Sequence, residues 1–167
     1  MKKIKKLNFG CGKDIKKGKE WINVDIQKNK NIDKSFDFDK FPYPFKDNEF
    51  DYVFADNVIE HLKNPRKVIL EFWRISKPNA IIEVIVPYFK AEGAYNDPTH
   101  KTFWNRRCIE QLLNPSYSYN KKNFEVLENK RFSTNKLRFV PSFIRYVLDY
   151  FMFNFYTGIK AKIKVVK

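Results

Sequence analysis

Two glycines and an acid near the start of the chain carry the first chemical signal. Residues 7–12 read as a short apolar strand that ends in a Gly-Cys-Gly turn, and residues 21–25 read as a second strand that ends on Asp25. Glycine lets the backbone turn sharply and approach a ligand, and an acid at the tip of the next strand can accept hydrogen bonds from a ribose diol. The pattern predicts a site for an adenine nucleoside.

The residues that this stretch lacks disfavour two classes of nucleotide ligand. A dinucleotide fingerprint requires a third glycine three positions after Gly12, where this chain has Ile15. A phosphate-binding P-loop requires a glycine at the position of Leu7 and Ser or Thr at that of Asp14. The segment between Gly12 and Asp25 is also short for a full crossover helix. A ligand without phosphates is therefore favoured, and a tight turn without a ligand is the alternative.

The front of the chain resembles the class I S-adenosylmethionine-dependent methyltransferases, especially a small branch with a shortened first helix. The resemblance covers roughly the first 105 residues and rests on segments 7–12, 23–25, 36–39, 42–45, 50–62, 71–87 and 97–100. Asp14 replaces the last glycine of the family motif, and Asn79-Ala80 replaces a Gly-Gly pair. Because Asn tolerates the left-handed conformation better than most residues, we expect the second turn to be kept.

The resemblance implies S-adenosyl-L-methionine as cofactor and a set of residues around it. In this reading Gly10 and Gly12 back the methionine moiety, Asp25 takes the ribose hydroxyls, and Asp37 meets the adenine. Turn capping is the alternative for Asp37 and for Asp39. The candidate cofactor-binding residues all follow expected strands, where α/β sheets bind ligands: Gly10, Cys11, Gly12, Asp25, Ile26, Asp37, Phe38, Asp56 and Asn57. Within this set Cys11 is interpreted as a small packing residue.

Methyl transfer from a sulfonium depends mainly on alignment, but an oxygen or nitrogen acceptor can still require loss of a proton. The candidate catalytic residues are His100, His61 and Asp56. For either histidine, a hydrogen-bonded structural role is the alternative. Glu60 and Asp97 could join the histidines in a metal site, but their spacing matches no metal motif, so no metal is expected.

The elements expected around these residues indicate an α/β fold. Strands are expected at 4–9, 21–26, 33–37, 51–55, 81–86, 124–132 and 159–166. Asn64 as N-cap and Pro65 at the first helical position begin a helix that ends before Pro78, with Val68, Phe72 and Ile75 on one stripe. Further helices are expected at 105–113 and 142–155. The alternation predicts a Rossmann-like, doubly wound, mostly parallel sheet covered on both faces. The resemblance adds an antiparallel last strand.

Composition is consistent with one domain over residues 1–167, of which the part from about residue 115 completes the sheet and matches the family only weakly. Two cysteines and no signal peptide indicate a reducing cytoplasm, and no apolar run is long enough to span a bilayer. The net charge of +14 is partly explained by a Lys- and Asn-rich composition typical of A+T-rich coding.

Three functions are compatible with these features. The first is methyl transfer to a small-molecule or saccharide acceptor, on oxygen, because the branch is associated with polysaccharide or glycolipid assembly. The second is RNA methylation, supported by the basic charge. Asp56-Asn57-Val58-Ile59 replaces the Asn/Asp-Pro-Pro-aromatic motif of amino-directed enzymes, which disfavours base N-methylation. The third is a non-catalytic interaction protein with the cofactor fold.

Residues 143–156 form a helical pattern that is apolar on almost every side. Ile144, Val147, Leu148, Phe151 and Phe155 lie on one stripe, which we expect to cover the sheet. A second aromatic face would then meet another subunit or a membrane surface, where Lys160, Lys162, Lys164 and Lys167 would suit anionic headgroups. Folding of residues 132–139 over the helix is the alternative.

Overall fold

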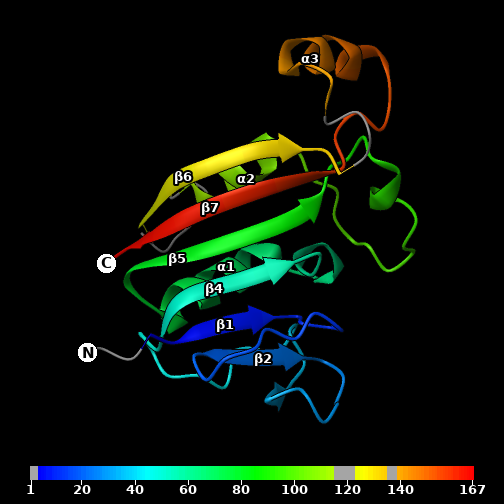
Figure 1. Cartoon of the computed structure of the whole chain (residues 1–167). Coiled ribbons are helices and arrows are strands. Elements are labelled where there is room, and N and C mark those ends of the chain that lie inside the picture. The colour runs from blue at the N-terminus through cyan, green and yellow to red at the C-terminus, as the bar shows by residue number, and fades with distance from the viewer. Residues whose placement is uncertain (1–3, 115–122, 135–138) are drawn as a thin grey trace.

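In the computed structural model, residues 4–114, 123–134 and 139–167 are described. The strands form a seven-stranded sheet in the order β3-β2-β1-β4-β5-β7-β6. Figure 1 shows how the sheet and the helices are arranged. The strands are β1 (Lys6–Phe9), β2 (Trp21–Asp25), β3 (Lys34–Ser35), β4 (Phe50–Asp56), β5 (Ser76–Pro87), β6 (Asn123–Phe132) and β7 (Gly158–Val166). The helices are α1 (Pro65–Ile75), α2 (Arg106–Leu113) and α3 (Ser142–Phe151), with short 3-10 turns η1 (Ile59–His61) and η2 (Glu92–Ala94).

Strand directions confirm the expected α/β class. The pairs β1–β2, β1–β4, β2–β3 and β4–β5 are parallel. Strand β7 lies between β5 and β6 and is antiparallel to both. This arrangement is the mostly parallel sheet with an antiparallel last strand that the sequence and the resemblance predict.

Helix α1 follows its sequence signals closely. The side chain of Asn64 accepts a hydrogen bond from the Lys67 backbone N–H at 3.0 Å, and Pro65 occupies the first turn. Phe72 on its buried stripe packs edge-on against Phe9 of β1, with ring centroids 4.9 Å apart. Beyond the helix, Asn79 has φ of 64°, so the expected left-handed turn is present. It lies early in β5, where the pairing of β5 with β4 shifts register.

The prediction that helices cover both faces of the sheet is wrong. In Figure 1, α1 and α2 both lie behind the sheet, and the described residues place no helix over its front. The segment between β1 and β2 forms turns and bends, so even the shortened first helix implied by the resemblance is missing. The loops joining the first four strands lack the apolar period that a covering helix needs.

The uncovered face of the sheet is polar, and ion pairs satisfy its charges. Glu83 interrupts the apolar run of β5 and accepts a hydrogen bond from the Tyr52 hydroxyl at 2.7 Å. Its carboxylate also pairs with Lys160 at 2.5 Å and Lys162 at 3.7 Å on β7. Because residues alternate between faces of a strand, β7 buries Ile163 and its apolar neighbours against the helices and leaves its lysines on the open side.

Helix α3 follows the expected pattern of burial only in part, since Leu148 packs against the core but other members of the stripe do not. It ends at Phe151 rather than at Phe155, and it projects from one end of the sheet (Figure 1). Val147 and Phe151, expected to cover the sheet, are 56% and 77% exposed. Among the helix side chains whose burial is described, the buried one is that of Asp149. Its carboxylate pairs with Arg131 at 2.6 Å and accepts a hydrogen bond from Tyr88 at 2.9 Å.

The alternative fold-back of residues 132–139 over the helix involves residues 135–138, which lie outside the described part of the chain. Phe139 itself is largely exposed. Among the described residues, no helix is long and apolar enough to cross a membrane.

Candidate active site

The turn after β1 has the open, left-handed geometry that its glycines predict. Gly10 has φ of +70°, and a Cβ placed there would lie only 2.1 Å from a methyl carbon of Val58. Gly12 has φ of +49° but faces open space, and a Cβ placed there would meet nothing within 4 Å. Its backbone N–H donates to Asp25 Oδ2 at 2.8 Å. Gly10 is therefore required for packing, and Gly12 leaves the turn open toward a ligand.

A cavity of about 370 Å³ opens at this turn, at the carboxyl ends of the parallel strands. Seven of the nine predicted cofactor residues line it: Gly10, Gly12, Asp25, Ile26, Asp37, Phe38 and Asn57. Cys11 and Asp56 do not. The Cys11 side chain is buried, and burial together with the nearby Asp25 raises the pKa of its thiol to about 11. That environment agrees with a packing role.

Two acidic residues of this cavity also accept hydrogen bonds from backbone N–H groups in its walls. Asp37 accepts the backbone N–H of Asp39 at 3.0 Å, and Asp39 accepts the backbone N–H of Lys63 at 2.8 Å. The capping role considered for both residues is therefore present, although both also line the cavity. Phe38 stacks on Phe9 with centroids 3.9 Å apart and is largely part of the core, while Ile26 is exposed at the rim.

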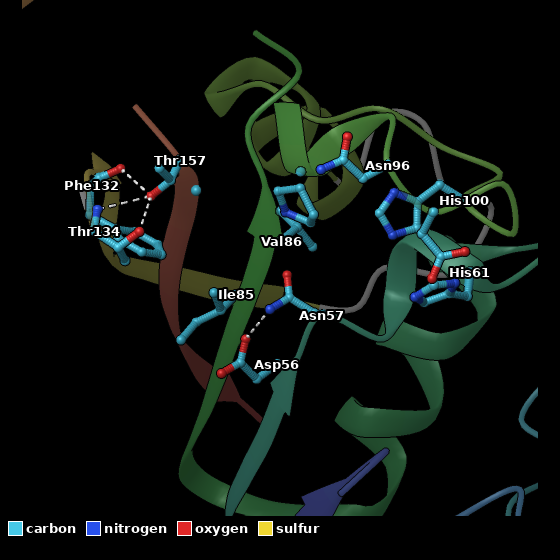
Figure 2. Close-up of a pocket in the computed structure, with 14 residues that line it drawn as sticks. Asp56, Asn57, His61, Ile85, Val86, Asn96, His100, Phe132, Thr134 and Thr157 are labelled. Carbon is cyan, nitrogen blue, oxygen red and sulfur yellow. Dashed lines mark hydrogen bonds between the residues drawn. The ribbon is translucent and has the colours of Figure 1, made fainter. Parts of the chain in front are cut away.

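A second cavity of about 730 Å³ adjoins the first, and the two share Asn57 and His61. Figure 2 shows the rings of His61 and His100 on one side of it and Thr157 on the other, with Asp56 between. Asn57 has φ of 50°, and its amide donates to Asp56 Oδ1 at 2.9 Å. Burial raises the pKa of Asp56. All three predicted catalytic residues thus line one cavity.

The two histidines, far apart in the sequence, lie with ring centroids 4.6 Å apart. His61 Nδ1 lies 2.8 Å from Thr99 Oγ1, and His100 Nδ1 lies 2.9 Å from the Ala94 carbonyl oxygen. Beneath them Glu60 is fully buried, and burial raises the pKa of its carboxyl to about 7. Burial and the neighbouring His100 lower the pKa of His61.

Sequence reasoning missed the far wall of the second cavity. Phe132, Thr134, Thr157 and Gly158 come from the ends of β6 and β7, and Thr157 Oγ1 lies 3.2 Å from Thr134 Oγ1. Their position depends on insertion of β7 beside β5, which pairs Gly158 with Pro87. No local motif marks these residues, so only the strand order could have placed them.

Comparison with known proteins agrees with this geometry. A family model described as a methyltransferase domain matches residues 7–84. The chain has the fold of the class I S-adenosylmethionine-dependent methyltransferases. The match contains the glycine turn, Asp25 and the histidine of η1, and it ends within β5. No curated protein sequence matches the chain.

Solved structures share the methyltransferase fold at low identity. A SAM-dependent methyltransferase from Archaeoglobus fulgidus has 18% identity and a TM-score of 0.61, and the alignment covers 96% of this chain and 86% of that one. An S-adenosylmethionine-dependent methyltransferase from Mesorhizobium loti has 9% identity, a TM-score of 0.66, and coverage of 96% and 90%. The [4+2]-cyclase SpnF has 16% identity, a TM-score of 0.66, and coverage of 98% and 74%. At these identities the likeness shows the fold.

The residues of the first cavity fit S-adenosylmethionine. Asp25 uses one lone pair of Oδ2 for Gly12 and one of Oδ1 for the Gln27 backbone N–H, so each oxygen can still accept a ribose hydroxyl. The open space at Gly12 allows close approach to the backbone. Asp25, Asp37 and Asp39 give the cavity acidic groups, which suit a ligand with a sulfonium and an ammonium charge.

Proposed function

We propose that this methyltransferase transfers its methyl group to an oxygen of a small-molecule or saccharide acceptor that enters the second cavity. The observation that carries this proposal is the shared boundary of the two cavities at Asn57 and His61. A cofactor in the first cavity and an acceptor in the second would meet there, beside the histidine pair. Alignment across such a boundary supplies most of the acceleration of a methyl transfer.

Each residue of the proposed site has a role in this reading. Gly10 and Gly12 form the turn that backs the methionine moiety, Asp25 accepts the ribose hydroxyls, and Asp37 with Phe38 lies beside the adenine. Bound S-adenosylmethionine supplies an electrophilic methyl group on a positively charged sulfur.

The acceptor side is assigned to the remaining candidates. His61 and His100 lie where an acceptor hydroxyl would arrive, and they promote loss of its proton. Asp56 lies against Asn57 at the boundary and orients the acceptor or the cofactor's amino group.

The lining of the second cavity favours a hydroxyl-rich acceptor over RNA. It offers hydrogen-bonding side chains on several sides, including Asn96, Thr134 and Thr157, which suit the hydroxyl groups of a sugar. Among the described residues that line it there are two acids, Asp56 and Asp97, and neither Lys nor Arg. A phosphate backbone needs basic contacts. Basic residues that could bind an RNA backbone therefore lie outside the second cavity.

Labelled cofactor tests the proposed function directly. Incubation of the protein with labelled S-adenosylmethionine and either a metabolite and glycan extract or an RNA pool should label the first and leave the second unlabelled. Label in RNA would favour the second function. Cofactor binding without label in any acceptor would favour the non-catalytic interaction protein.

We also propose that α3 contacts a second subunit. Its exposed residues, among them Phe143, Tyr146, Tyr150 and Phe151, form an apolar surface beside the site. The lysines expected to support a membrane contact lie along β7, where Lys160 pairs with Glu83. They therefore add little charge near the helix, which favours a protein partner over an anionic membrane. The free cysteines remain compatible with a cytoplasmic location.

A further inference from the structure

Three groups with lone pairs converge at the back of the second cavity. Glu60 and His61 come from η1, and His100 comes from the loop after η2. One ligand atom from each lies within 4.8 Å of the others, and His100 Nε2 is 3.9 Å from Glu60 Oε1. Zinc sites in enzymes use two histidines and a glutamate in this way, with one position open.

Hydrogen bonds fix the tautomers of both rings. The Ala94 carbonyl can only accept, so His100 Nδ1 carries the proton and donates it. The Thr99 hydroxyl donates to Asp97 Oδ1 at 2.6 Å, so toward His61 it acts as an acceptor, and His61 Nδ1 donates. In the neutral rings both Nε2 atoms then carry lone pairs. Histidines that bind metals are oriented by the same kind of outer hydrogen bond from the other nitrogen.

Burial of the Glu60 carboxylate is energetically unfavourable when no cation is bound. Its side chain is fully buried, and neither carboxylate oxygen has a hydrogen-bond partner in another described residue. A buried carboxylate without a donor is strongly unfavourable unless it is neutralised or coordinates an ion. The donors of the neighbouring rings are used elsewhere, toward Ala94 and Thr99. When Glu60 is ionised, three acceptors therefore face one another with no donor from another described residue between them.

We propose that Glu60, His61 Nε2 and His100 Nε2 bind a divalent transition-metal ion of the Zn²⁺ type, with an open position toward the acceptor. Metal bonds of about 2.1 Å require ligand atoms roughly 3–4 Å apart, so a shift of less than about 1 Å would close the site. Borderline-soft imidazoles with one carboxylate favour a first-row transition metal over Mg²⁺ or Ca²⁺.

This inference rests on the proposed function and explains how the histidine pair acts in it. An acceptor hydroxyl on the open position would have its pKa lowered by the ion. The O–H bond breaks and its proton leaves to water. The oxygen then forms a bond to the methyl carbon while the carbon–sulfur bond breaks, and its electron pair stays on the sulfur as a neutral thioether.

Metal binding can be measured without cofactor or acceptor. Chelator-treated protein with the cysteines replaced (Cys11→Ala, Cys108→Ser) is titrated with Zn²⁺ by calorimetry and with Co²⁺ by visible absorption. We expect one ion per chain, and affinity at least tenfold weaker in Glu60→Gln and His100→Ala. Glu92→Gln makes the same chemical change in the exposed η2 turn and should bind like the parent.

The outcomes separate this inference from the proposed function. Failure of the parent to bind either ion, or equal binding by Glu60→Gln and the parent with unchanged thermal unfolding, overturns the metal site. Full methyl transfer by chelator-treated enzyme also overturns it and leaves the proposed function standing. An ion bound at one per chain, with no acceptor labelled in any extract, supports the metal site and contradicts the proposed function.

Discussion

The backbone N–H of Gly12 donates to Asp25 Oδ2 over 2.8 Å, so the acid that ends β2 also fixes the turn that ends β1. A ligand that binds Asp25 would therefore also stabilise the glycine turn. The glycine turn and Asp25 are in this sense one unit built from two adjacent parallel strands.

Substitution of this acid should weaken cofactor binding. Asp25→Ala removes the proposed ribose acceptor and should cost about 2 kcal/mol in S-adenosylmethionine affinity, roughly 30-fold. Asp25→Asn keeps an oxygen for Gly12 but loses the charge, so its loss of cofactor affinity should be smaller than that of Asp25→Ala. Asp14→Ala is the control, since its exposed carboxylate pairs with Lys16 in the same loop. Calorimetry that finds the Asp25 variants and the control equal would contradict the assignment.

The two glycines of the turn should respond differently to alanine. Gly10→Ala places a Cβ against Val58 in a left-handed conformation, so it should lower the free energy of unfolding by about 2 kcal/mol or more. Gly12→Ala meets open space and should cost only about 1 kcal/mol of strain, while its methyl group obstructs the cofactor. Denaturant unfolding together with cofactor titration measures both effects. Equal destabilisation by the two variants would argue against this division of roles.

His100→Ala should separate catalysis from cofactor binding. We expect turnover to fall about 100-fold or more, because the acceptor's proton is no longer released efficiently. Affinity for S-adenosylmethionine should stay near that of the parent, since His100 lines only the second cavity. Single-turnover methyl transfer measures the catalytic rate, and equilibrium binding measures the affinity for S-adenosylmethionine. A parallel loss of cofactor affinity would assign the ring a structural role.

The exposed surface of α3 should control association. Tyr150 and Phe151 are 79% and 77% exposed, and Tyr150→Ser with Phe151→Ser should convert a dimer to a monomer in sedimentation experiments. Tyr95→Ser changes an exposed aromatic residue outside α3 and should leave the dimer intact. A monomeric parent that floats with anionic vesicles would support the membrane contact instead, and a monomer that ignores vesicles would refute both.

Glu83 should make stability depend on pH in the acidic range. Burial raises its pKa, but hydrogen bonds from Lys160 and Tyr52 outweigh this effect, and the pKa is lowered from the ordinary 4.5. A lowered folded-state pKa stabilises the fold above the unfolded value and loses that contribution as pH falls through the folded value. Glu83→Gln should therefore lose about 1–2 kcal/mol at pH 7 and show a flatter acid-unfolding curve. Identical pH profiles of the two proteins would contradict this role.

The gathering of residues around the first cavity could be predicted because its signals are local. Gly10, Gly12 and Asp25 follow strands whose apolar pattern is clear, and the carboxyl-end rule then places them together. Helix α1 was predictable for a similar reason, since Asn64 and Pro65 mark its start. The acceptor half depends on contacts between distant segments.

The errors in the prediction have a common physical origin. Apolar periodicity in α3 predicts burial against the sheet, but the helix is held by the polar contact between Asp149 and Arg131. Similarly, alternation of strands and helices predicts two helical layers. Loop composition in the first third of the chain does not support a second helical layer. Glu83, a charged residue inside β5, indicates the face of the sheet that no described helix covers.

The insertion of β7 between β5 and β6 also separates the two cavities along the sequence. The described residues that line the first cavity lie between Gly10 and Lys101, whereas those of the second include Thr157 and Gly158. Synthesis proceeds from the N-terminus, so the described residues of the first cavity leave the ribosome before β7 does. Until β7 is made, β5 lacks its antiparallel partner, and the second cavity lacks its far wall. In the proposed site, the residues assigned to the cofactor would therefore be synthesised before the far wall of the cavity assigned to the acceptor.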